Sequence, residues 1–218
     1  MSLINKEIAD FSAQAFIKAA GAEKGKFKTI TKADLLDKWS VLFFYPADFT
    51  FICPTELEDL ANLYEKFQNI GCEIYSVSCD THFVHKAWHE NSPKVGRITY
   101  PMLADPTAAL ARDLDVYIEA DGMAERGTFI INPKGRVAAY EVNAGNVGRN
   151  ADELLRTSAL PAGTLIGLDK NYALEQICGS EITVEYDKLI DRQLERAAIT
   201  SISGFAKLFG DASKVLKV

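Results

Sequence analysis

The chain has 218 residues, of which 48% are hydrophobic and 25% are charged, the composition of a folded globular protein. Its formal net charge of −6 disfavours nucleic acid as a partner, because the phosphates would repel the protein. The sequence shows no secretory leader, and no apolar run approaches the roughly 20 residues that a membrane helix needs. We therefore expect no membrane partner and a cytoplasmic location.

The first two-thirds of the chain alternate apolar runs with amphipathic segments, which predicts a layered α/β domain. The apolar run 41–45 is typical of a strand that is buried on both faces. Apolar residues at steps of three and four predict a helix from Pro54 to Gly71. A second strand is expected over 73–80, and a second helix over 81–90.

Turn and cap residues organise the next part of the chain. Asp105 and Pro106 predict the start of a helix, because Asp is a common N-cap and Pro suits the first turn. The segments 128–132 and 136–142 flank a Pro-Lys-Gly turn, which predicts a hairpin. A further helix is expected to begin at Ala151.

The alternation of apolar runs and amphipathic segments changes after residue 156, so we expect a domain over 1–156 and a C-terminal extension over 157–218. Pro and Gly residues mark the start of the extension as a loop. Tyr186, Ile190 and Leu194 lie four residues apart, which predicts an amphipathic helix.

Of the four cysteines, Cys53 has the setting of a reactive thiol. It follows the loop after the strand 41–45, and Pro54 favours a helix that starts at or just after it. A thiol at a helix N-terminus faces free amide groups and the positive end of the helix dipole, which favour the thiolate. Cys72 and Cys79 lie in or beside a predicted strand, so we expect small buried side chains there.

Three further residues are candidates for the surroundings of Cys53. Thr50 precedes it by three residues and offers a hydroxyl across the same turn, and Pro46 can shield the sulfur from water. A cation would complete such a site, because it stabilises a thiolate and the charge that develops on a reacting atom. Arg126 directly precedes a predicted strand that can lie beside the strand leading to Cys53.

The arrangement of Pro46, Thr50 and Cys53 in FYPADFTFICPTE resembles the signature of the peroxiredoxin family. Residues from about 3 to 156 resemble the typical two-cysteine members, in particular the alkyl hydroperoxide reductase C branch. The segments YSVSCDTHFVHKAWH and ERGTFIINPKG occur in the family's order. The resemblance implies an α/β, thioredoxin-like fold with a central mixed sheet flanked by helices. It also implies that Cys53 is the peroxidatic cysteine and that Arg126 is the active-site arginine.

The same resemblance implies an enzyme that reduces hydrogen peroxide and small organic hydroperoxides. Cys53 would be the nucleophile, Thr50 and Arg126 would stabilise the reacting oxygens, and Pro46 would shield the site. Homodimers, which in the family often form rings of dimers, are implied as well. Electrons would come from a thioredoxin-like protein or a dedicated disulfide reductase. No cofactor is expected, because the sequence has neither a GxGxxG fingerprint for a flavin nor a CxxCH site for haem.

The resemblance ends in the extension. A sulfenic acid on Cys53 must be resolved, and in the family a C-terminal cysteine in a Val-Cys-Pro motif does this. The present sequence has no such motif, and its one late cysteine is Cys178 in EQICGSE. Cys178 can resolve if it is exposed and within reach. The alternatives are a one-cysteine cycle with an external thiol and a tail without a function.

Two other functions stay open from the sequence. An oligomeric holdase or a peroxide-sensing relay would bind partner proteins, and the extension together with the family's tendency to assemble suggests it. A thiol–disulfide oxidoreductase is the second, and the absence of a CxxC pair counts against it.

His82, His85 and His89 lie on one face of a predicted helix, which raises the question of a metal site. Residues 82 and 89 would lie about 10 Å apart along the helix axis, too far to share one ion. Two of the histidines together with Cys79 are the alternative. We expect structural or surface histidines and no metal.

Overall fold

The computed structural model describes residues 2–159 and, beyond them, the backbone of five short strands. The chain divides into two compact units, residues 1–158 and 159–218. No helix in the described part of the chain is long and apolar enough to cross a membrane.

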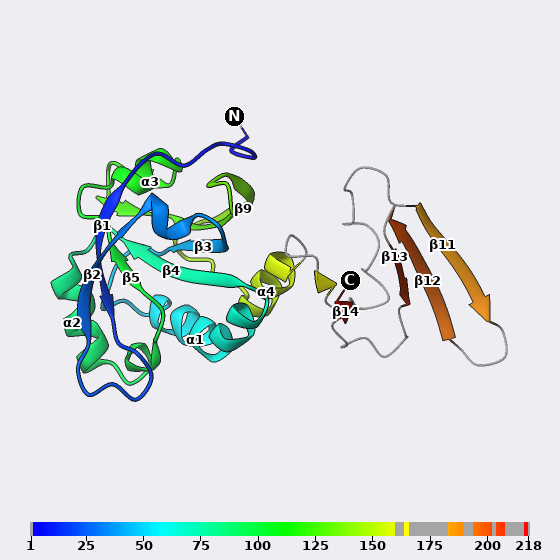
Figure 1. The fold of residues 1–218 in the computed structure, drawn as a ribbon. Helices are drawn as coiled ribbons and strands as arrows, with labels where there is room; N and C mark the ends of the chain where they lie inside the picture. The colour runs from blue at the N-terminus through cyan, green and yellow to red at the C-terminus, as the bar shows by residue number, and fades with distance from the viewer. Residues whose placement is uncertain are drawn as a thin grey trace. The chain divides into compact units, whose positions relative to one another are not determined.

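A seven-stranded mixed sheet with the order β2-β1-β5-β4-β3-β8-β9 forms the first unit (Figure 1). Strand β3 pairs in parallel with β4 and antiparallel with β8, so the strand that begins with Arg126 lies beside the one that leads to Cys53, as expected. The strands are β1 (Ser12–Ile17), β2 (Lys26–Thr31), β3 (Trp39–Phe44), β4 (Cys72–Ser78), β5 (Met102–Ala104), β8 (Arg126–Ile131) and β9 (Val137–Asn143), with a separate small hairpin of β6 (Tyr117–Ile118) and β7 (Met123–Ala124).

Helices cover both faces of this sheet, and Figure 1 shows α3 and α1 on opposite sides of β3 and β4. Leu42 and Phe44 of β3 belong to the core cluster that contains residues of α3, whereas Val41 and Phe43 point to the other face. All four side chains are buried, which confirms the expected burial on both faces. The helices are α1 (Cys53–Asn69), α2 (His82–Asn91), α3 (Ala109–Asp113) and α4 (Ala151–Ala159), with short 3-10 turns η1 (Lys32–Leu35) and η2 (Val95–Arg97).

The helix predicted from Asp105 starts later than expected, because α3 begins at Ala109. Asp105 nevertheless caps it: the amides of Ala109 and Ala111 donate to its carboxylate at 2.8 and 2.9 Å. Ala108, the residue directly before the helix, lies in the left-handed region with φ of 54°, so the chain turns once before the helix forms.

The helix predicted over Tyr186, Ile190 and Leu194 is wrong, because the second unit contains strands there. Strands β11 (Thr183–Leu189), β12 (Leu194–Ser201) and β13 (Gly204–Lys207) form an antiparallel meander. Strand β10 (Thr164–Leu165) pairs with β14 (Leu216–Lys217). Tyr186 and Leu194 lie on different strands, which pair antiparallel, and Ile190 lies outside the described residues.

Candidate active site

Cys53 is the first residue of α1, where the sequence predicted it. Its side chain is buried and lies, with Pro46, Thr50 and Arg126, in the lining of a pocket of about 440 Å³. The N-cap residue Ile52 makes no side-chain hydrogen bond to the helix, so no side chain caps the positive end of α1. The structure therefore brings together the four residues singled out in the sequence.

Arg126 supplies a cation beside the thiol. Its Nη1 donates to Cys53 Sγ at 3.4 Å and to Glu56 Oε2 at 2.5 Å, and its Nε donates to the carbonyl oxygen of Gly145 at 2.8 Å. The side chain is 3% exposed, so water screens this charge little. The position at the start of β8 holds the guanidinium against the N-terminus of α1.

Glu56 and Arg149 form a second, buried part of the site that the sequence interpretation left out. The amide and Nε of Arg149 donate to Glu56 Oε1 at 2.8 and 3.0 Å, and Nη2 donates to Oε2 at 3.2 Å. The Arg149 guanidinium also lies over the ring of Phe43, 3.4 Å from its centroid. Burial lowers the pKa of Arg149, and the hydrogen bonds to Glu56 oppose that shift.

The buried side chains beside the thiol carry unequal numbers of positive and negative charges. Arg126 and Arg149 carry two positive charges against the single negative charge of Glu56. A thiolate on Cys53 would balance them. A cation beside the sulfur is what a cysteine nucleophile needs, because the thiolate is its reactive form.

Thr50 and Pro46 lie in the loop between β3 and α1. The Thr50 hydroxyl donates to the carbonyl oxygen of Ala47 at 2.9 Å, so its lone pairs remain available to accept a hydrogen bond. Both residues line the pocket that reaches Cys53. Their position fits the predicted roles of Thr50 as a polar contact and Pro46 as a shield.

The other described cysteines lack such an environment. Cys72 is buried, and burial raises its pKa to about 12. Cys79 is half-buried rather than fully buried as expected, and burial followed by the nearby Asp105 raises its pKa to about 11. Both therefore stay thiols at neutral pH. Cys178 lies outside the described residues.

The three histidines have structural partners. His85 and His89 are buried, and their Nε2 atoms lie 3.0 and 2.9 Å from the carbonyl oxygens of Leu103 and Ile98. The ring of His82 packs on Phe83, with 4.0 Å between centroids. Among residues 2–159, no three His, Cys, Asp or Glu side chains converge as ligands for a metal ion.

A mixed sheet with a buried thiol at the N-terminus of α1 and an arginine across from it places this chain among the thioredoxin-like thiol enzymes. Comparison with known proteins gives the class and the family. The model of the AhpC/TSA family matches residues 4–140. Alkyl hydroperoxide reductase C of Staphylococcus aureus (strain N315) is 56% identical over 154 residues, which cover 71% of this chain and 79% of that protein.

Solved structures agree with this match. AhpC of Enterococcus faecalis superimposes with a TM-score of 0.69 at 47% identity, covering 74% of this chain and 93% of its own. The reduced 2-Cys peroxiredoxin of Plasmodium vivax superimposes with a TM-score of 0.67 at 27% identity, covering 73% and 96%. The protein is thus an enzyme of the peroxiredoxin class with the expected thioredoxin-like fold. The chain belongs to the AhpC/TSA family.

Removing the charge of Glu56 should destabilise the fold. In Glu56→Gln an amide donor would face the guanidinium of Arg126 or Arg149, and two buried cations would lose their counter-ion. We expect unfolding in urea to show a loss of about 3–5 kcal/mol. The matched control is Glu58→Gln on the same helix, whose pairs with Lys94 and Arg97 involve exposed cations. It should lose less than about 1 kcal/mol, and equal losses would contradict the role assigned to the buried cluster.

Proposed function

We propose that the protein reduces hydrogen peroxide and small organic hydroperoxides through the thiolate of Cys53. The observation that carries this proposal is the contact of 3.4 Å between Arg126 Nη1 and Cys53 Sγ at the wall of the pocket. It supports a site in which one cation serves both the nucleophile and the peroxide. A pocket wall with apolar side chains of Phe51, Ile118 and Met123 supports substrates with a small organic group.

The reaction balances with the groups in this pocket. The Cys53 thiolate attacks the terminal oxygen of ROOH, the S–O bond forms and the O–O bond breaks. The products are Cys53 sulfenic acid and an alkoxide or hydroxide, which takes a proton from water. The sulfur loses two electrons and the peroxide gains them.

Each pocket residue has a defined part in this step. Arg126 donates to the peroxide oxygens as charge develops on the leaving oxygen. Thr50, whose own proton is committed to Ala47, accepts the hydrogen bond of a peroxide O–H. The amide of Cys53, the first of α1, is directed toward the N-terminal end of the helix, where it can donate to the same oxygens. Pro46 excludes water beside the sulfur.

A second thiol completes the cycle. It condenses with the sulfenic acid to form a disulfide and water, and a thioredoxin-like protein or a dedicated disulfide reductase then returns two electrons. We propose Cys178 or an external thiol as this second thiol.

Assembly into homodimers, or rings of dimers, and a cytoplasmic location remain predictions from the sequence.

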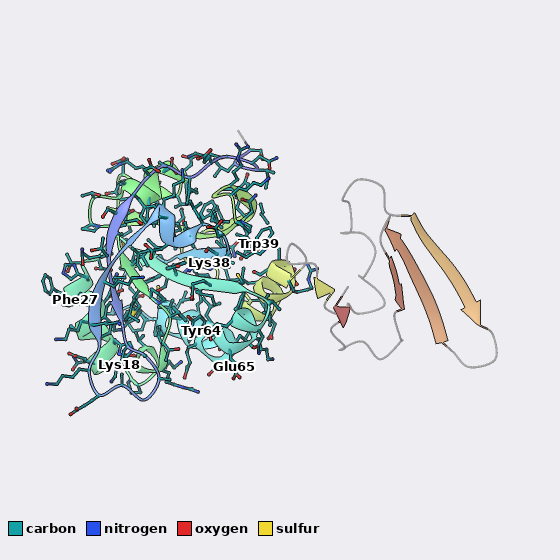
Figure 2. The ribbon with its side chains drawn as sticks, in the orientation of Figure 1. Lys18, Phe27, Lys38, Trp39, Tyr64 and Glu65 are labelled. Carbon is teal, nitrogen blue, oxygen red and sulfur yellow. The ribbon has the colours of Figure 1, made fainter. Side chains whose placement is uncertain are left out.

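A role in binding other proteins is the second candidate, and one surface feature favours it. Phe27 of β2 (Figure 2) and Phe83 of α2 are exposed and pack edge to face, with ring centroids 5.5 Å apart. Exposed aromatic side chains of this kind are common where proteins associate. This supports a holdase or a relay of oxidation to partner proteins beside the peroxidase.

The first experiment determines the oxidation state of all four cysteines after the reduced protein has been treated with one equivalent of hydrogen peroxide. We expect peptide mass spectrometry to find oxidation at Cys53, and Cys72 and Cys79 unchanged because their pKa values are raised. A Cys53–Cys178 disulfide would establish a two-cysteine cycle. Sulfenic acid that persists at Cys53 would assign resolution to an external thiol. Reduced Cys53 in the presence of remaining peroxide would overturn the proposal.

A further inference from the structure

A buried hydrogen-bond network holds the loop that carries Pro46 and Thr50, and its centre is Asp48. Tyr45 Oη donates to Asp48 Oδ1 at 2.7 Å, and His85 Nδ1 lies 2.8 Å from Asp48 Oδ2. The amide of Asp48 donates to Asp80 Oδ2 at 2.8 Å. The side chains of Asp48 and His85 are 1% and 0% exposed. The loop is thereby tied to α2 and to residues just after β3 and β4.

The partners of His85 determine how many protons it shares with Asp48. Its Nε2 lies 3.0 Å from the carbonyl oxygen of Leu103, which can only accept, so Nε2 carries a hydrogen. The contact of 2.8 Å between Nδ1 and Asp48 Oδ2 then needs one more proton. That proton sits on Nδ1 of an imidazolium or on the Asp48 carboxyl, and the pair is neutral overall either way. Burial raises the pKa of Asp48, which favours retention of this proton.

The network fixes a strained piece of backbone. Phe49, directly after Asp48, has φ of 57°, a left-handed conformation that is unfavourable for a large side chain. The residue is 59% exposed and its ring contacts Trp88, with centroids 6.0 Å apart, so packing alone holds it weakly. Pro46 and Thr50 flank this strained residue and both line the pocket.

We propose that His85 and Asp48 act as a positioning pair, in which one shared proton ties the loop to α2 and sets Pro46 and Thr50 against Cys53. The inference rests on the proposed peroxidase function, but it concerns residues that touch neither the peroxide nor the thiol. Loss of the His85–Asp48 contact lets the strained loop relax. Displacements of about 1 Å in a reacting site can cost on the order of 10²-fold in rate.

Two substitutions at the same position separate the halves of the network. In His85→Asn the amide nitrogen occupies about the place of Nδ1 and keeps the bond to Asp48, whereas in His85→Gln it occupies about the place of Nε2 and keeps the bond to Leu103. The second-order rate constant for hydrogen peroxide, measured by competition with a haem peroxidase of known rate, is the readout. We expect His85→Gln to lose about tenfold or more, and His85→Asn to stay within about threefold of the parent.

His89→Gln is the matched control for damage to the helix. His89 lies one turn further along α2, is buried, and bonds the carbonyl oxygen of Ile98 through Nε2. Among the described residues its Nδ1 has no hydrogen-bond partner, so Gln keeps the one bond that the side chain makes. We expect the rate constant of His89→Gln to stay near that of the parent.

Asp48→Asn tests the shared proton even if the His85 variants fold poorly. The side-chain amide that replaces the carboxyl group can donate to a neutral His85 and its oxygen can still accept from Tyr45, so the rate constant should be retained. The proposal is overturned if His85→Gln reacts as fast as the parent, if both His85 variants slow equally, or if Asp48→Asn slows as much as His85→Gln. Failure of the parent protein itself to react at Cys53 would instead refute the peroxidase function.

Discussion

Cys53→Ser should abolish peroxide reduction, with a rate constant at least about 10³-fold below that of the parent. A serine hydroxyl stays protonated at neutral pH, so the buried cluster of Arg126, Arg149 and Glu56 can no longer be neutralised by the nucleophile. The measurement is consumption of hydrogen peroxide with dithiothreitol as the electron donor, which needs no physiological reductase.

Cys72→Ser and Cys79→Ser are the controls for this variant, because burial keeps both of these thiols protonated. They should keep the parent's rate constant. Activity that survives in Cys53→Ser and disappears in Cys79→Ser would place the nucleophile elsewhere. The Cys53→Ser protein also addresses the second candidate function, since suppression of client aggregation that persists in it would support a binding role independent of peroxide.

Arg126→Lys should lower the rate constant by about 10²-fold, although the charge is conserved. Arg126 uses Nε for Gly145 and Nη1 for both Glu56 and Cys53, and a single ammonium group cannot reach these three partners at once. The loss is that expected for a misplaced donor to a developing oxyanion. Single-turnover oxidation of Cys53, followed over time by thiol alkylation, gives the rate constant directly.

The control for Arg126→Lys is Arg97→Lys, an exchange in an exposed pair with Glu58. It should change neither the rate constant nor the stability measurably. Equal rates in Arg126→Lys and the parent would show that the guanidinium serves the fold and not the reaction.

Local signals in the sequence were enough to predict the part of the site that lies in the loop before α1 and at its first residue. Pro46, Thr50 and Cys53 lie within eight residues, and a strand, a loop and Pro54 together placed the thiol at a helix N-terminus. The hairpin of β8 and β9 and the helix α2 also follow from turn residues and periodicity. Arg126 needed one further assumption, that its strand lies beside β3, and the sheet order confirms it.

The rest of the site depends on contacts between residues far apart in the sequence. In the sequence, Glu56 is a first-turn residue that favours the helix dipole, and only folding brings Arg126 and Arg149 to it across 70 and 93 residues. His85 is one of three histidines on a helix face, and its contact with Asp48 spans 37 residues. No local pattern carries information about such pairs.

By itself the sequence determined the layered α/β class and the place of Cys53 at the N-terminus of α1, because backbone propensity and burial act over a few neighbouring residues. The mixed sheet was implied by the resemblance to a family, and the strand pairings confirm it. Tertiary structure alone decided that Glu56 and Arg149 join Arg126 beside the thiol, and that Asp48 meets His85, because these partners come together only when distant segments of the chain pack. It also decided the second unit, where the pairing of β11 with β12 forms strands in place of the expected helix.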